Sequence, residues 1–337
     1  MTRSYTCIAL ALASLALAGG ALAQDADYHG TSAANFLKIG LGARASGMAD
    51  AYITQVEDAS ALYWNPGAVS RLARPSIVYS NLQWLVDTDL NYAAVTVPFS
   101  FGTLGLDMVY FTSGDIKETT LQEQDGTGRV VSASDLALGL TYARNLTDRF
   151  SFGLKVKYIR ESLAGVAASA LAVDVGSVFT TSFIGDLAIG MALSNFGGSM
   201  RFEGRDLMVT YPVPGSPTGK QVPATLETQD WPLPLFFRFG VSANVVKSEQ
   251  VGMVLVYSIT DARDYEARHN VGTAVRFLNV FTLRGGYRFN YDEVTFSAGA
   301  GVEPVIPGFG TVSFDYAYTD FGNFKAVHQF TIGVLVE

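Results

Sequence analysis

Residues 136–143 read LALGLTYA, and every second side chain in this stretch is large and apolar. Because successive side chains of a β-strand point to opposite faces of a sheet, the large set lies on one face and the small set on the other. The same alternation recurs in LAIGMALS at 187–194 and in VSFDYAYT at 312–319. The small face carries too few charges for an ordinary wet surface. The pattern therefore favours a barrel with lipid outside and a polar lumen inside.

Fourteen segments of this kind predict an all-β fold, a 14-stranded antiparallel transmembrane β-barrel over residues 76–337. The two long connections, 113–133 and 197–232, follow the third and the seventh segments. Bacterial outer-membrane barrels have short periplasmic turns and long outer loops, so both long connections are expected on the outer side. Counts of 12 or 16 strands stay open at this stage. The predicted strands are 76–84, 89–98, 102–112, 134–144, 149–160, 169–180, 186–196, 233–244, 249–260, 267–277, 280–290, 294–302, 310–319 and 327–336.

The first 23 residues have the pattern of a secretory signal peptide. Arg3 gives a positive start, Ile8–Ala18 an apolar core, and Ala21–Ala23 a cleavage motif. The single cysteine, Cys7, falls inside this segment, so the mature chain is expected to be free of cysteine ligands, disulfides and nucleophiles. The formal net charge of −8 argues against a nucleic-acid partner, which would select a basic surface. Export and the barrel pattern together predict the bacterial outer membrane as the location.

Residues 24–75 lack strand alternation and are rich in glycine, which predicts a compact plug, or hatch, ahead of the barrel. Within it, Asp58 is expected to cap one helical turn that Pro66 ends. The pair Gly40 and Gly42 imitates part of a dinucleotide-binding loop, but it lacks the strand–turn–helix context. No cofactor is predicted. The motif residues of the plug are Asn35, Gly40, Gly42, Arg44, Gly47, Asp58, Asn65 and Pro66.

Residues 35–69 read NFLKIGLGARASGMADAYITQVEDASALYWNPGAV, which resembles the N-terminal signature of the PorV/PorQ family. That family is a branch of the FadL-like outer-membrane proteins, which are 14-stranded barrels with an N-terminal hatch. The resemblance implies two different functions. PorV-like members are shuttle components of type IX secretion and bind C-terminal domains of secreted proteins. FadL-like members pass long-chain fatty acids or other hydrophobic compounds inward. A barrel of mainly structural role is the third hypothesis.

Charged residues on the predicted lumen face form a second candidate site, centred on Arg276, Arg284, Arg288 and Asp315. These side chains are expected either to pair with carboxylates of the barrel and the plug, or to anchor the carboxylate of a fatty acid or a peptide C-terminus. On the lipid face such charges would cost about 2–4 kcal/mol each. The other predicted lumen charges are Asp107, Lys155, Lys157, Asp174 and Arg238.

The three histidines, His29, His269 and His328, have neither metal-ligand spacing nor a serine placed beside them by the pattern. No catalytic or metal residue is therefore predicted, and the protein is not expected to be an enzyme. The expected partners are outer-membrane lipid, secreted proteins or subunits of a secretion machinery, and hydrophobic small molecules. The connection 197–232, rich in proline and glycine, is either a polar surface loop or a docking surface at the outer mouth.

Overall fold

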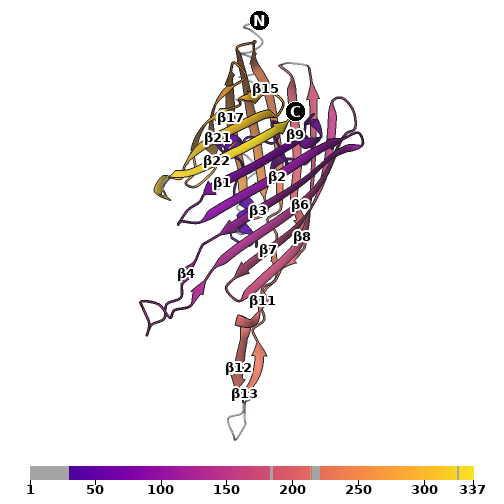
Figure 1. The fold of residues 1–337 in the computed structure, drawn as a ribbon. Coiled ribbons are helices and arrows are strands. Elements are labelled where there is room, and N and C mark those ends of the chain that lie inside the picture. Colours follow the sequence, from indigo (N-terminus) through magenta and orange to yellow (C-terminus); the bar gives the residue numbers. More distant parts are fainter. Residues whose placement is uncertain (1–29, 183–184, 213, 215–220, 325) are drawn as a thin grey trace.

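The computed structural model describes residues 30–182, 185–212, 214, 221–324 and 326–337. The predicted signal peptide and the first residues of the predicted plug lie outside this range. The described residues form a tall barrel with a narrow ribbon that projects from one end (Figure 1). They contain no helix long and apolar enough to cross a membrane.

Fourteen long strands of the described residues pair antiparallel with their neighbours and close into a barrel, which confirms the predicted fold. Closure comes from the pairing of the first strand with the last and of β8 with β9. Closure leaves the wall without an open sheet edge, as a membrane requires. The strands are β1 (Ser76–Gln83), β2 (Asp89–Phe99), β3 (Gly102–Thr112), β6 (Ala133–Asn145), β7 (Phe150–Leu163), β8 (Val166–Thr181), β9 (Leu187–Gly197), β15 (Phe236–Lys247), β16 (Val251–Ala262), β17 (Tyr265–Phe277), β18 (Phe281–Phe289), β19 (Phe296–Val302), β21 (Gly310–Asp320) and β22 (Ala326–Val336).

The two faces of the wall are divided as the alternation predicts. Large apolar side chains are exposed on the outside, among them Leu138, Leu140, Phe152, Phe281 and Tyr316. Leu136 and Ile189 occupy the same face of their strands, because they lie two residues from Leu138 and Met191. Small and polar side chains point inward and are buried.

Both long connections emerge at the same end of the barrel, opposite to the C-terminus (Figure 1). The first holds β4 (Ile116–Lys117) and β5 (Val130–Val131), which pair with each other. The second holds β10 (Ser199–Met200), β11 (Glu203–Gly204), η4 (Arg205–Leu207), β12 (Met208–Pro212), β13 (Gln221–Thr225) and β14 (Trp231–Pro232). Their common position agrees with the prediction that both long connections lie on one side, and we call this end of the barrel the outer end. At the opposite end β20 (Val305–Ile306) pairs with β21, and η5 (Gly322–Phe324) follows β21 at the outer end.

Residues 30–75, the N-terminal segment, form four short helical turns: η2 (Asn35–Lys38), α2 (Ala43–Gly47), α3 (Ala61–Trp64) and η3 (Ala68–Arg71). Turn α2 contacts β18, β19, β21 and β22, whereas η3 contacts β3, β6, β7 and β8. The segment therefore touches the inward faces of both halves of the wall. Its large side chains, such as Leu41, Met48 and Tyr52, are almost fully buried.

Two glycines of the wall show why the inward-facing side chains are small. The Oδ1 of Asn65 and the ring of Pro66 lie against Gly176, and the carbonyl of Pro66 lies against Gly153. A Cβ atom at either glycine would collide with the N-terminal segment. The small inward residues of the wall therefore match the backbone that packs against them.

The helical turn expected near Asp58 differs in one detail. Turn α3 has Ser60, not Asp58, as its N-cap. The Asp58 carboxylate instead accepts hydrogen bonds from the backbone N–H and the hydroxyl of Ser60. The turn ends at Asn65, which is extended as expected for a residue before proline.

Candidate functional site

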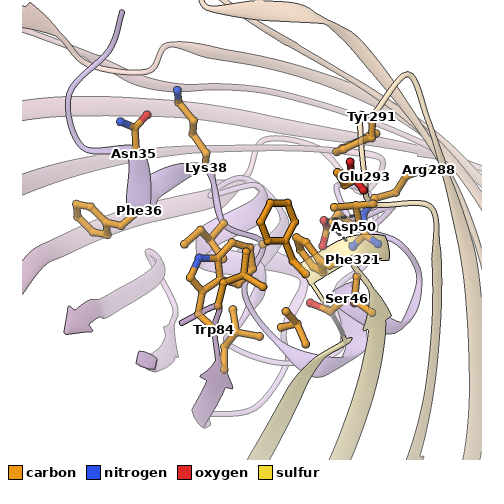
Figure 2. A pocket seen from close by; sticks show the side chains of 18 of the residues that line it. Asn35, Phe36, Lys38, Ser46, Asp50, Trp84, Arg288, Tyr291, Glu293 and Phe321 are labelled. Carbon is orange, nitrogen blue, oxygen red and sulfur yellow. Dashed lines mark hydrogen bonds and ion pairs between the residues drawn. The ribbon is translucent and has the colours of Figure 1, made fainter. Parts of the chain in front are cut away.

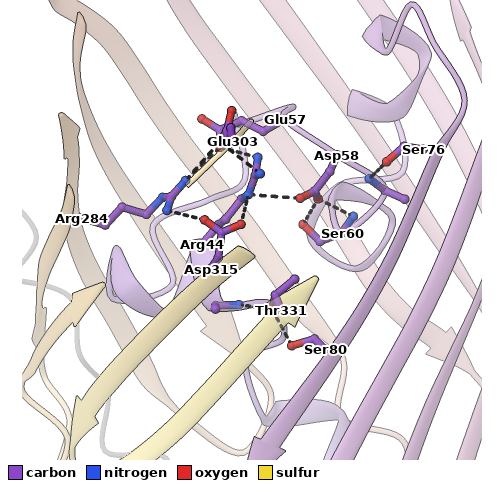
Figure 3. A network of polar contacts seen from close by, with 12 residues as sticks. Arg44, Glu57, Asp58, Ser60, Ser76, Ser80, Arg284, Glu303, Asp315 and Thr331 are labelled. Carbon is purple, nitrogen blue, oxygen red and sulfur yellow. Dashed lines mark hydrogen bonds and ion pairs between the residues drawn. The ribbon is translucent and has the colours of Figure 1, made fainter. Parts of the chain in front are cut away.

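Arg44, on α2, is the centre of a buried ion-pair network between the N-terminal segment and the wall (Figure 3). Its Nε lies 2.8 Å from Oδ2 of Asp315 on β21 and 3.3 Å from Oδ2 of Asp58. Its Nη1 lies 2.9 Å from Glu57, and its Nη2 lies 3.1 Å from Glu303. A buried guanidinium is stable only with such partners, so the position of Arg44 fixes the segment against the wall.

Two wall arginines complete this network. Arg284 Nη1 lies 2.7 Å from Oδ1 of Asp315, and its Nη2 lies 3.4 Å from Glu57. Arg276 Nη2 lies 3.2 Å from Glu57 and 3.5 Å from Glu303. Burial by itself would raise the pKa of Glu57, but the charges of Arg44, Arg284 and Arg276 outweigh it and lower that pKa to about 2.

The predicted lumen cluster is divided by the structure. Arg276, Arg284 and Asp315 meet in the network of Arg44. Arg288 instead pairs with Asp50 of the N-terminal segment, at 2.9 Å between Nη2 and Oδ2. Each of these arginines already has a carboxylate of the chain beside it, which corresponds to the first of the two predicted roles.

The remaining lumen charges line the opposite wall. Lys155 Nζ lies 2.6 Å from Asp107, and Lys157 Nζ lies 2.9 Å from Asp174. The guanidinium of Arg238 lies over three aromatic rings, those of Phe236, Tyr63 and Trp64, at 4.7, 5.5 and 5.4 Å. Such cation–π contacts stabilise a cation that is out of water.

The other motif residues of the N-terminal segment hold its backbone in place. Asn65 Nδ2 donates to the carbonyls of Ile53 and Ser177, at 3.1 and 3.0 Å, and thereby joins the segment to β8. Gly42 has φ +91°, in the left-handed region that favours glycine, and precedes α2. Gly47 packs against Gly299 of β19. Gly40 lies beside Asp50, and Asn35 donates to the carbonyl of Ser32.

A cavity of about 590 Å³ lies between the N-terminal segment and the outer end of the barrel, and we call it the outer cavity (Figure 2). Its floor includes Phe36 and Lys38 of the segment, and its walls come from the outer ends of the strands and their turns. Trp84 and Phe321 meet edge to face on this wall, with their ring centroids 5.1 Å apart. The pair of Asp50 and Arg288 borders the same space.

Sequence reasoning missed Glu57, Glu303 and the aromatic residues of the outer cavity. Glu303 directly follows β19, and its position places it on the face of Gly299 and Gly301, which point inward. The alternation of β19 could therefore have identified it. Trp84 is the last residue of the predicted strand 76–84, one residue beyond the observed end of β1, and Phe321 lies beyond its strand, where the alternation gives no signal.

A family model described as "Type IX secretion system protein PorV" matches residues 23–206, more than half of the chain. The chain belongs to the PorV family. This confirms the family resemblance predicted from residues 35–69, and with the barrel fold it places this PorV-family protein in the bacterial outer membrane. No curated protein matches the chain.

Solved structures with a similar fold include a toluene transporter and a FadL homologue. The toluene transporter TbuX of Ralstonia pickettii has a TM-score of 0.55 and 11% identity, and the match covers 88% of this chain and 99% of that one. A Pseudomonas aeruginosa FadL homologue has a TM-score of 0.53 and 12% identity, and the match covers 87% and 97%. At this identity the likeness shows a shared fold. The absence of enzymatic activity stays a prediction.

Proposed function

We propose that this PorV-family protein is a component of type IX protein secretion that holds secreted polypeptides at its outer end. The observation that carries the proposal is the family match over residues 23–206. The position of both long connections at one end supports it, because they offer a large surface outside the membrane (Figure 1). The ligand is expected to be the C-terminal domain of a secreted protein.

We further propose that the N-terminal segment is a plug that closes the lumen. The buried pairs of Arg44, the contacts of Asn65 and the burial of Tyr52 and Met48 support this role. A closed lumen leaves the polypeptide no route through this barrel. The barrel would then serve as a membrane anchor that presents its outer connections to cargo.

Deletion of residues 205–228 tests the proposal in cells. The deletion removes the projecting ribbon and leaves the fourteen wall strands intact. It should abolish release of a reporter fused to the C-terminal domain of a secreted protein, while the barrel still shows a heat-dependent shift on gels. Deletion of residues 120–126, in the other long connection, shows whether that connection belongs to the same docking surface. Normal release by the 205–228 deletion would refute docking at this connection.

The outer cavity favours one alternative function, transport of hydrophobic compounds. Its size, about 590 Å³, is that of a small-molecule site, and aromatic side chains such as Phe36, Trp84 and Phe321 line it. Reconstituted vesicles loaded with the protein should take up labelled long-chain fatty acid if this function is correct. Uptake by the wild type, combined with secretion that is insensitive to the 205–228 deletion, would replace the secretion proposal by the transporter.

A further inference from the structure

The projecting ribbon of β12 and β13 presents a two-stranded sheet to solvent. All five residues of β12 are exposed, and the two strands pair only with each other within the described residues. Met208 and Tyr211 are 61% and 54% exposed. An isolated two-stranded ribbon is marginally stable in water, so a third strand would stabilise it.

The pairing register shows which backbone groups are free. The N–H of Leu226 donates to the carbonyl of Leu207, at 2.8 Å, so these two residues form a hydrogen-bonded pair. Hydrogen-bonded and non-bonded pairs alternate along an antiparallel ladder. The register of Val209 with Ala224 and of Tyr211 with Val222 therefore gives the next two bonded pairs. The residues between them direct their N–H and C=O groups outward.

The two outer edges of the ribbon are not equivalent. On β13 the middle residue of the outward set is Pro223, which has no N–H, so this edge cannot support a continuous ladder. On β12 the outward residues are Met208, Thr210 and Pro212. The N–H of Met208 already donates to the carbonyl of Arg205, and Pro212 has no N–H, so the middle residue, Thr210, is the one that offers a donor on this edge. Residues 208–212 and 221–225 carry no charged side chain. The β12 edge therefore lacks both the charges and the central proline that usually protect an exposed edge.

We propose that the β12 edge, Met208–Tyr211, receives an extended segment of a secreted polypeptide, which joins the ribbon as a third strand. The inference rests on the proposed secretion function and specifies how cargo is held. Main-chain hydrogen bonds supply the affinity in strand addition, so a single edge can accept segments of different sequence. The exposed side chains of Met208 and Tyr211 lie on opposite faces of the ribbon and offer apolar contacts on either side.

A second copy of this chain does not fit the same edge. Two barrels inserted in one membrane in the same direction are related by an axis normal to that membrane. The ribbon extends roughly along the length of the barrel (Figure 1), so this axis runs parallel to β12. Such a rotation places each free N–H of one edge opposite the same N–H of the other, and no ladder forms. An antiparallel pair would need the two barrels to point in opposite directions.

A matched pair of proline substitutions tests the proposal. Thr210→Pro removes an outward N–H from the β12 edge, and Thr225→Pro removes one from the β13 edge, while neither alters the bonded pairs of the ribbon. The probe is the purified C-terminal domain of a protein that cells fail to release when this chain is deleted. We expect Thr210→Pro to weaken binding about tenfold or more, because it leaves a partner carbonyl without its hydrogen bond, and Thr225→Pro to bind within about twofold of wild type.

The outcomes separate this inference from the function on which it rests. If the 205–228 deletion abolishes binding but both proline variants bind like wild type, the edge is not the site and the proposed function stands. Equal weakening by both variants also refutes the edge, since it indicates a contact of the ribbon as a whole. A change of oligomeric state in Thr210→Pro without cargo would identify a second copy as the occupant. If the deletion itself leaves binding intact, docking at this connection is refuted as well. Heat-shift gels confirm that each variant is folded.

Discussion

Arg44 Nε donates a hydrogen bond of 2.8 Å to Oδ2 of Asp315, and this contact joins residues that lie 271 positions apart in the chain. Asp315 also accepts from Arg284, at 2.7 Å, so one carboxylate holds a guanidinium of the N-terminal segment and another of the wall. The side chain of Asp315 is fully buried. Asp315 therefore joins the N-terminal segment directly to the wall.

Asp315→Ala should release the N-terminal segment. The substitution leaves Arg44 and Arg284 each without one buried partner, and breaking a buried pair in this way costs about 3–5 kcal/mol. Limited proteolysis of the folded protein should then trim the segment much faster than in wild type. Asp261→Ala, at an exposed strand position, is the control and should leave the rate unchanged. Equal rates for wild type and Asp315→Ala would show that the network does not hold the segment.

The network should also respond to acid. Because the pKa of Glu57 is lowered to about 2, its stabilising contribution is complete above the ordinary carboxyl value of 4.5 and is lost as the pH falls through about 2. We expect the segment to resist pepsin near pH 4 and to be cut increasingly toward about pH 2. In Glu57→Gln this step should be smaller. Release already between about pH 5 and 4 would contradict the lowered pKa.

The N-terminal segment packs closely on Gly176 of β8, so a larger residue at this position should destabilise the protein. In Gly176→Ala the new Cβ meets the side chain of Asn65 and the ring of Pro66, so we expect a loss of about 1–3 kcal/mol from overpacking. Gly252→Ala is the matched control, because a Cβ there meets no atom of the described residues within 4 Å. Thermal unfolding in detergent measures the difference. A similar midpoint for both variants would place the segment away from Gly176.

Ion conductance tests whether the segment closes the lumen. In planar bilayers the wild type should conduct weakly, since the segment contacts both halves of the wall. Asp315→Ala should show larger and more frequent openings, whereas Asp261→Ala should behave like wild type. A steady large conductance in the wild type would contradict the plug and favour transport through the barrel.

The wall could be predicted from sequence because its signal is local. The alternation of large and small side chains gives strand positions within about three residues: β6 runs from Ala133 to Asn145, against 134–144 predicted. The end of β7, the start of β8 and both ends of β15 each differ from the prediction by three residues, and β15 begins at Phe236 rather than at 233. Pro234 explains why β15 begins later in the sequence than predicted, because proline has no N–H to donate to the ladder.

The contacts of the N-terminal segment could not be predicted, because they join distant residues without a periodic signal. Arg284 and Arg288 both point inward, and sequence reasoning placed them in one cluster. Four residues of strand separate them by about 13 Å, so they meet different carboxylates, Asp315 and Asp50. The alternation predicts whether a side chain of the wall points inward or outward. The carboxylate that an inward-facing arginine meets depends on where the N-terminal segment crosses the lumen.

Cross-linking in secreting cells tests the central proposal, cargo held at the outer end, most directly. The only cysteine of the sequence is Cys7, so single cysteines can be introduced at chosen sites. Leu226→Cys lies beside the ribbon at the outer end, and Leu278→Cys lies in a short turn at the opposite end, and both positions are exposed. With a thiol-reactive photo-cross-linker, secreted protein should be captured at position 226 and not at 278. Equal capture at both positions, or none at 226 while secretion continues, would contradict the account.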